Sequence, residues 1–109
     1  MNQIDEQVYV GGTPSPEEVS ALAANGIKAI ICNRPDHEDP GQPDANSIKQ
    51  AAEDKGLTFV HIPQIAGGPV LPETLTAMEE AVANLPRPLF IYCRSGGRAT
   101  KLYEMVSAK

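Results

Sequence analysis

Hydrophobic residues along this chain fall into two alternating patterns. Four short, mostly apolar runs occupy residues 7–10, 27–32, 57–62 and 89–92. Between and after them, apolar residues recur every three or four positions over residues 16–24, 44–55, 72–85 and from residue 97 onward. Short runs of this kind are typical of strands, and the longer spacing is typical of amphipathic helices. The pattern predicts the order β-α-β-α-β-α-β-α.

The first predicted helix has the clearest start signal. Ser15 suits the N-cap, Pro16 suits the first helical position, and Glu18 completes a capping box with Ser15. Asn25-Gly26 supplies a stop at the other end.

The apolar run at residues 27–32 indicates the kind of sheet. Its continuous pattern, rather than strict alternation, is typical of a parallel strand that is covered on both faces. We therefore expect an α/β fold of three layers, with about four mostly parallel strands flanked by helices, in a single domain over residues 1–109. Ligands of such sheets bind at the carboxyl ends of the strands. Those ends lead here into residues 33–43, 63–71 and 93–97.

Charge is unevenly spread along the chain. The net charge is −5, with −7 in residues 1–54 and +2 in residues 55–109. Proteins that bind nucleic acid need lysine and arginine patches, so we expect no nucleic-acid partner. Three bases, Arg94, Arg98 and Lys101, lie close together in the second half. This basic cluster on an acidic chain favours a small anionic ligand.

Several other classes of protein do not fit the composition. The chain has no apolar stretch long enough to span a bilayer, and its first residues do not resemble a secretory signal, so we expect a cytoplasmic protein with no membrane partner. Asp36-His37-Glu38-Asp39 contains metal-ligating residue types, but four consecutive ligands cannot converge on one ion. We expect a solvated acidic loop there, and neither a metal nor a cofactor.

The two cysteines lie in different settings. Cys32 ends an apolar run, where cysteine behaves as a small buried hydrophobe. Cys93 begins the segment Cys93-Arg94-Ser95-Gly96-Gly97-Arg98, between a predicted strand and a predicted helix. A disulfide between them is not expected in the cytoplasm.

The segment 93–98 is the strongest candidate for chemistry. A glycine-containing turn between a strand and a helix can aim successive backbone N–H groups at one point, where the helix dipole also favours negative charge. A cysteine at the start of such a turn becomes a thiolate nucleophile more readily. We predict Cys93 as the nucleophile and Arg98 as its catalytic partner. Arg94, Ser95, Gly96 and Gly97 are predicted to bind the anion.

This segment resembles the active-site loop of rhodanese sulfurtransferases, which starts with cysteine and ends with arginine or threonine. The rest of the chain is similar to the phosphatase-like domain family of beta-lactamase hydrolase-like proteins. The matching segments are Val10-Gly11-Gly12, Ser15-Pro16, Asn33-Arg34-Pro35-Asp36, Gly41-Gln42-Pro43, His61-Ile62-Pro63 and the cysteine segment itself. This resemblance implies a fold like that of dual-specificity phosphatases, and persulfide-handling enzymes as partners. It leaves two chemistries open, phosphoester hydrolysis and sulfur transfer.

Three features of the sequence favour sulfur transfer. Tyrosine-phosphatase-like enzymes separate the cysteine and arginine by five residues, whereas four separate Cys93 from Arg98. They follow the arginine with Ser or Thr, whereas Ala99 follows here and only Thr100 beyond it offers a hydroxyl. Their general-acid aspartate has no counterpart in residues 62–68, which leaves the carboxylates Asp36, Glu38, Asp39 and Glu73 as candidates.

Because a thiolate leaving group departs unprotonated, sulfur transfer needs no such acid. We therefore expect a sulfurtransferase that passes sulfur through a Cys93 persulfide from a small anionic or persulfide substrate to a thiol or cyanide. One alternative is a phosphatase that acts on phosphate monoesters through a Cys93 phosphocysteine. Another is a non-catalytic module that carries sulfur or senses anions.

Three further residues lie at the carboxyl ends of predicted strands. Arg34 and Asp36 follow the strand at residues 27–32 and are predicted to reach the same cleft, the alternative being a loop ion pair or turn cap. His61 ends the next strand, where a structural histidine is favoured over a base, although the resemblance keeps it among the predicted substrate-binding residues. Gln64 and Gly67-Gly68 are candidates for a cleft wall.

Overall fold

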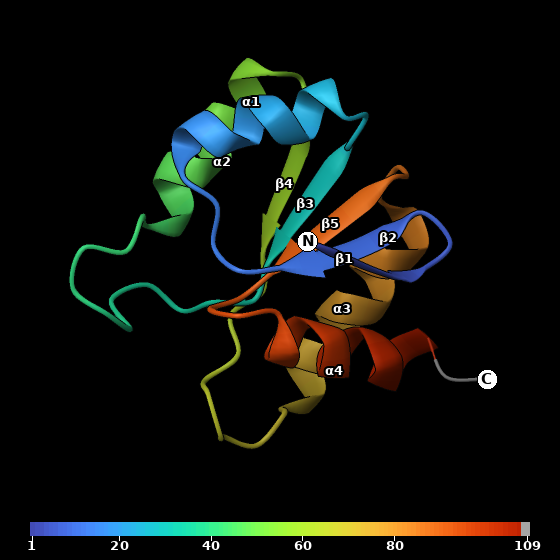
Figure 1. Ribbon diagram of the computed structural model, residues 1–109. Coiled ribbons are helices and arrows are strands. Elements are labelled where there is room, and N and C mark those ends of the chain that lie inside the picture. The colour runs from blue at the N-terminus through green and yellow to red at the C-terminus, as the bar shows by residue number, and fades with distance from the viewer. Residues whose placement is uncertain (108–109) are drawn as a thin grey trace.

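The chain folds into one sheet with helices on both faces. The computed structural model describes residues 1–107 (Figure 1). The strands are β1 (Asn2–Asp5), β2 (Val8–Gly11), β3 (Ala29–Cys32), β4 (Thr58–His61) and β5 (Leu89–Tyr92). The helices are α1 (Pro16–Ala24), α2 (Ala45–Asp54), α3 (Pro72–Asn84) and α4 (Gly97–Ser107). None of the described helices is long and apolar enough to cross a membrane.

The sheet has the strand order β1-β2-β5-β3-β4. Strands β2, β5, β3 and β4 pair in parallel, which confirms the four parallel strands predicted from the sequence. The fifth strand, β1, pairs antiparallel with β2 and was not predicted. Its sequence, Asn-Gln-Ile-Asp, has one apolar residue because β1 lies at an edge of the sheet and is largely exposed.

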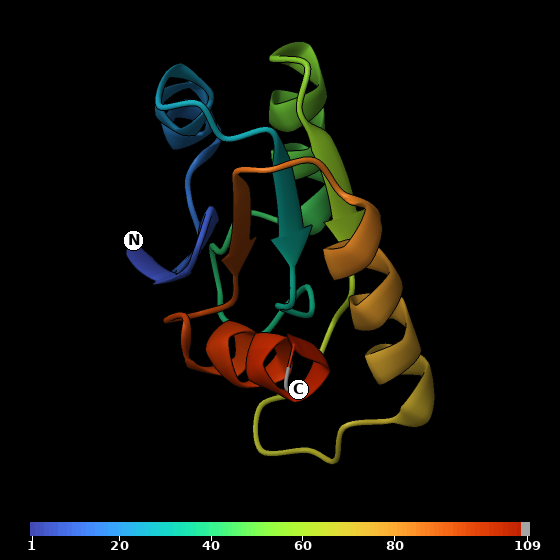
Figure 2. The same cartoon turned by 90° about the vertical axis from the view of Figure 1, so that its right-hand side faces the viewer.

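The helices form two outer layers, as expected. Figures 1 and 2 show α1 and α2 on one face of the sheet and α3 and α4 on the other. Side chains from alternate strand positions fill two separate cores. Ile30, Cys32 and Tyr92 face the α1/α2 side, where Val19 and Ile48 pack. The α3/α4 core contains Ala29, Ile31, Ile91, Met78, Leu102 and Cys93.

Capping groups fix where the helices begin. Ser15 accepts a hydrogen bond from the Glu18 N–H, and the Glu18 carboxylate accepts one from the Ser15 N–H, so the predicted capping box is confirmed. The second helix begins one residue later than predicted, at Ala45, because Asp44 is its N-cap and accepts from the Ser47 N–H.

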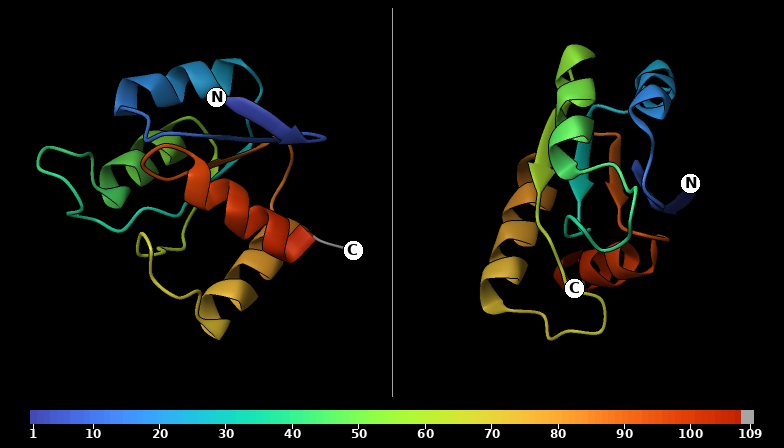
Figure 3. Two further views of the ribbon diagram at one scale, coloured as in Figure 1. Left: turned by 60° about the horizontal axis from the view of Figure 1, so that its bottom comes forward. Right: turned by 90° about the vertical axis from the view of Figure 1, so that its left-hand side faces the viewer.

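The parallel strands bring three connections to one edge of the sheet. Residues 33–43 follow β3, residues 62–71 follow β4, and residues 93–96 join β5 to α4. Figures 2 and 3 show these connections leaving the same end of the strands. The candidate site lies here, at the edge that the sequence predicted.

Candidate active site

Cys93 follows directly after β5, the middle strand of the five-stranded sheet. Its backbone is held from the β2 side, where the Cys93 N–H donates to the Gly11 carbonyl at 3.3 Å. The Thr13 hydroxyl donates to the Cys93 carbonyl at 3.0 Å. The residue is 1% exposed, so its sulfur lies below the surface at the bottom of the turn.

The turn after Cys93 aims backbone N–H groups at the sulfur. The Gly96 N–H donates to Cys93 Sγ at 3.1 Å, and Gly96 has a φ of 102° that suits glycine. Burial of the sulfur opposes ionisation, but hydrogen bonds from the backbone N–H groups of Ala99, Ser95, Gly96 and Arg98 outweigh it. The pKa of the Cys93 thiol is therefore lowered from its ordinary value. We call residues 93–98 the Cys93 loop.

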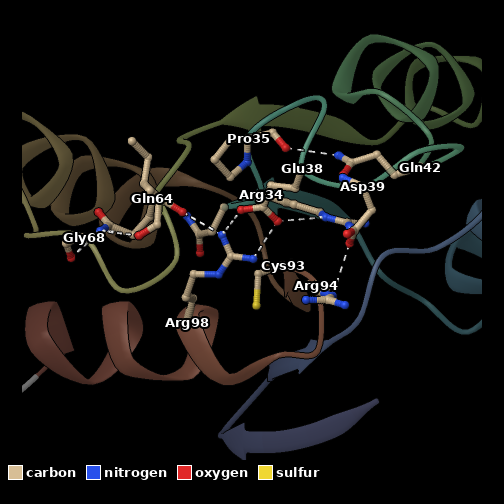
Figure 4. A network of polar contacts seen from close by, with 12 residues as sticks. Arg34, Pro35, Glu38, Asp39, Gln42, Gln64, Gly68, Cys93, Arg94 and Arg98 are labelled. Carbon is tan, nitrogen blue, oxygen red and sulfur yellow. Dashed lines mark hydrogen bonds and ion pairs between the residues drawn. The ribbon is translucent and has the colours of Figure 1, made fainter.

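Arg98 lies beside the sulfur and is held by two other loops (Figure 4). Its Nη1 donates to Glu38 Oε2 at 2.6 Å and to the Gln64 carbonyl at 2.7 Å, and its Nη2 donates to Glu38 Oε1 at 2.9 Å. This paired geometry fixes the plane of the guanidinium group. The Glu38 carboxylate also raises the pKa of Arg98, so the side chain stays charged.

The acidic loop at residues 36–39 was predicted to be solvated; His37 is exposed, but Glu38 and Asp39 pair with arginines of the site, which corrects the prediction for these two residues. Glu38 pairs with Arg98 and with Arg34 Nε at 3.1 Å, and its side chain is 19% exposed. Asp39 Oδ2 pairs with Arg34 Nη2 at 2.6 Å and with Arg94 Nε at 3.2 Å. Arg98 first, and then Arg34, lower the pKa of Glu38 against the opposing effect of burial. Among the described residues no cluster suited to a metal ion occurs.

The structure separates the roles of Arg34 and Asp36. Arg34 is 6% exposed and donates from Nη1 to the Thr13 hydroxyl, which in turn donates to the Cys93 carbonyl, so Arg34 connects the acidic loop with the segment after β2 and with the Cys93 loop. Asp36 points elsewhere, because its Oδ1 accepts from the Ala45 N–H at the start of α2, at 2.7 Å. Asp36 therefore caps the start of α2, as the turn-cap alternative predicted. Arg34 is the buried centre of a group of ion pairs.

Other predicted site residues have structural contacts. The Thr100 hydroxyl donates to the Gly96 carbonyl at 2.8 Å, so it stabilises the turn. His61 Nε2 lies 3.0 Å from the Arg34 carbonyl. Ser95 is exposed on the Cys93 loop, and Gly97 begins α4. Arg94 is exposed, and its Nε pairs with Asp39 of the site.

Thr13 is the residue that sequence reasoning missed. It links Arg34 to the Cys93 carbonyl through one hydroxyl group. A possible signal was its place directly after Gly11-Gly12, at the carboxyl end of a parallel strand. Gln64, by contrast, lies beside the site as predicted, because its backbone carbonyl accepts a hydrogen bond from Arg98.

This arrangement suits attack on an anionic group. The thiolate supplies a nucleophile, the loop amides and Arg98 supply positive charge for the oxygens of the bound group, and the surrounding ion pairs fix their positions. The carboxylates Glu38 and Asp39 are each paired with two arginines. Glu73 is exposed in the first turn of α3.

Comparison with known proteins shows the family to which the chain belongs. Residues 1–109 match the family described as beta-lactamase hydrolase-like protein, phosphatase-like domain. A beta-lactamase hydrolase-like protein of Agrobacterium fabrum is 36% identical over 107 residues, which cover 97% of this chain and 24% of the relative. One from Xylella fastidiosa is 32% identical over 94% of this chain and 23% of the relative. The chain thus spans about a quarter of the length of these curated relatives.

Solved structures share the fold. A candidate phosphatase from Neisseria meningitidis has a TM-score of 0.83 and 34% identity, with coverage of 93% of this chain and 71% of that chain. The core catalytic domain of the PP-IP phosphatase Siw14 from S. cerevisiae has a TM-score of 0.72 and 20% identity, covering 96% of this chain and 62% of that chain. The fold implied by the resemblance, that of the phosphotyrosine phosphatases, is confirmed.

Proposed function

Because this chain belongs to the phosphatase-like domain family of beta-lactamase hydrolase-like proteins, we propose that it is a cysteine-dependent phosphatase acting on phosphate monoesters. The observation that carries the proposal is the Cys93 sulfur, which faces the amides of its own loop. The likeness to a candidate phosphatase at 34% identity supports phosphate as the bound group. This reverses the preference for sulfur transfer that the loop length suggested.

The first step forms a phosphocysteine. The Cys93 thiolate attacks phosphorus, an S–P bond forms, and the P–O bond to the leaving group breaks with its electron pair on the departing oxygen. The loop amides and Arg98 hold the oxygens of the transferred phosphoryl group. Glu38 and the Gln64 carbonyl act through Arg98, because they fix its Nη1 and Nη2 atoms and thereby its orientation.

The second step returns the enzyme to its starting state. Water attacks the phosphocysteine, a P–O bond forms, and the S–P bond breaks with its electron pair on sulfur. Both protons of the water remain with the released phosphate or pass to solvent. The lowered pKa of Cys93 makes the thiolate a competent leaving group in this step.

Sulfur transfer is the second candidate, and one specific feature favours it. Only four residues separate Cys93 from Arg98, which gives a small loop that suits a persulfide. In this reaction the thiolate would attack the outer sulfur of a donor and hand it to a thiol or cyanide. The same nucleophile and the same arginine would serve both reactions.

A side-by-side assay separates the candidates. Wild type, Cys93→Ser and the control Cys32→Ser are tested for hydrolysis of 4-nitrophenyl phosphate and for sulfur transfer from thiosulfate to cyanide. We expect hydrolysis in wild type and the control, and a loss of about a thousandfold or more in Cys93→Ser, since the nucleophile is removed.

Each other result has a clear meaning. Hydrolysis that survives in Cys93→Ser would overturn the proposal. Turnover of thiosulfate without hydrolysis would assign the domain to sulfur transfer. A persulfide mass shift on Cys93 without turnover of either substrate would assign it to sulfur carriage.

A further inference from the structure

We propose that the preferred substrates of this site are phosphoanhydrides, in which the leaving group is itself a phosphate, and that Lys101 binds this second phosphate. The inference rests on the proposed phosphatase function and extends it from phosphate monoesters to phosphoanhydrides as the preferred substrates. Two independent observations carry it. One is that the nearby carboxylates are already bound to arginines or to a backbone N–H group, and the other is a basic cavity next to Arg98.

The first observation concerns proton donation to the leaving group. An alkoxide leaving group needs a proton from a general acid, which must therefore be protonated at working pH. Glu38 accepts hydrogen bonds from both Arg98 and Arg34, and Asp39 accepts one from Arg34 and forms an ion pair with Arg94. Arginine partners favour the ionised form of a carboxylate. Arg98 and Arg34 lower the pKa of Glu38, so this side chain is held as a carboxylate rather than as an acid, and the carboxylate oxygens of Asp39 are engaged by its two arginine partners.

The third carboxylate of the same loop is also occupied. Asp36 accepts from the Ala45 N–H at 2.7 Å, where it stabilises the first turn of α2. This hydrogen bond turns the Asp36 side chain toward α2. The carboxylate of this loop that contacts Arg98 is Glu38. A phosphate leaving group needs no proton to depart as an anion, so it fits a site built in this way.

The second observation is a cavity between residues 64–70 and helix α4. It has a volume of about 200 Å³ and is lined by Arg98, Lys101 and Gln64, together with Ile65, Gly67, Gly68, Val70 and Leu102. Lys101 lies three positions after Arg98, which places the two side chains on one side of α4.

The charge of this cavity is opposite to that of the chain. Two of its lining residues are basic and none is acidic, although the chain has a net charge of −5. Arg98 lines this cavity and also lies beside Cys93, so one side chain connects the cavity with the nucleophile. A second anionic group on the substrate would meet the exposed Lys101 there.

The reaction balances without a general acid. The Cys93 thiolate attacks the terminal phosphorus, the S–P bond forms, and the bridging P–O bond breaks with its electron pair on the leaving phosphate. That phosphate leaves as an anion, and Lys101 balances its growing charge. Water then hydrolyses the phosphocysteine as in the proposed function.

The test compares three substrates without divalent metal ions. Inorganic pyrophosphate offers a phosphate leaving group, glycerol 2-phosphate offers an alkoxide, and 4-nitrophenyl phosphate measures the proposed function by itself. We expect kcat/KM for pyrophosphate to exceed that for glycerol 2-phosphate by about tenfold or more, since only the alkoxide lacks its required proton.

Lys101→Gln tests the second phosphate site. We expect it to lower kcat/KM for pyrophosphate about tenfold, the size of one charge-assisted contact, and to lower that for 4-nitrophenyl phosphate much less. Lys49→Gln, which removes an exposed lysine from α2, is the matched control and should change neither value.

The outcomes distinguish the two proposals. Hydrolysis of 4-nitrophenyl phosphate with equal use of pyrophosphate and glycerol 2-phosphate would overturn the phosphoanhydride inference and keep the phosphatase. Equal losses on pyrophosphate and 4-nitrophenyl phosphate in Lys101→Gln would overturn the role of Lys101. Failure to hydrolyse any of the three would overturn the phosphatase and the inference together.

Discussion

At the scale of single residues, the two cysteines show what the backbone contributes to the chemistry. Both thiols are buried, and burial raises the pKa of each. For Cys32 burial dominates, so its pKa is raised overall. For Cys93 four backbone N–H groups reverse the direction. The difference arises from the turn between β5 and α4 and not from the residue type.

Alkylation by iodoacetamide tests this difference. Because only the thiolate reacts, Cys93 should react at pH values below those of an ordinary thiol, and its rate should fall as the pH drops through its lowered pKa. Cys32 should stay unreacted in the folded protein, since its raised pKa keeps the thiol protonated. Mass spectrometry of Cys32→Ser and Cys93→Ser isolates each thiol. An ordinary pH profile for Cys93 would contradict the argument.

Some of the site was predictable at this scale and some was not. Cys93 and Arg98 lie in one short segment, so their spacing and the two glycines between them marked them. The pairing of Glu38 with Arg98 spans 60 positions, and local spacing carries no information about it. The run of acids at residues 36–39 fits a solvated loop as well as a paired one, and only the three-dimensional fold brings Arg94 and Arg98 to it.

At the scale of elements, the end of β2 packs closely against the Cys93 loop. A side chain at Gly12 would place its Cβ 2.9 Å from the Arg94 carbonyl oxygen. A Cβ at Gly96 would lie 3.4 Å from the Gly11 Cα, at a φ of 102°. The glycines at the end of β2 therefore let the nucleophile loop lie directly against the neighbouring strand.

Gly12→Ala should disturb this contact. The new methyl group must displace backbone, so we expect a loss of about 1–3 kcal/mol in the free energy of unfolding, measured in urea. Gly97→Ala is the control in the same region, because the nearest atom to its Cβ is the Ser95 hydroxyl oxygen at 4.0 Å. It should be neutral or slightly stabilising. Equal stability of Gly12→Ala and wild type would show that the loop moves without cost.

The elements themselves were mostly predictable from the sequence. The capping box before α1 and the continuous apolar pattern of β3 gave correct elements because both depend on local chemistry or on burial of both faces. The edge strand β1 escaped prediction. It gains its hydrogen bonds from β2 and buries little, so its sequence is not constrained to be apolar.

At the scale of the whole molecule, the sheet separates two cores. Ile31 packs in the core under α3 and α4, whereas Ile48 packs in the core under α1 and α2. Three layers of this kind follow from helices that alternate with parallel strands, which is why the sequence predicted them.

Two conservative truncations should act independently across the sheet. Ile31→Val and Ile48→Val each remove one buried methyl group, and each should cost about 0.5–1.5 kcal/mol of unfolding free energy. The double variant should lose the sum to within about 0.5 kcal/mol, since the two side chains share no core. Urea unfolding of wild type, the two single variants and the double variant completes this double-mutant cycle. A deviation well above this value would mean that the cores are coupled through the sheet.

The central place of β5 also sets the order in which parts of the molecule open. Strands flank it on both sides, and hydrogen bonds from Cys93 to Gly11 and from Asn33 to Tyr92 continue the ladder past its end. Fraying of an outer strand such as β1 or β4 breaks none of these bonds. Amide exchange at Cys93 then requires the middle of the sheet to separate, the event that costs most. Cys93 thus keeps its position during local unfolding of the outer strands.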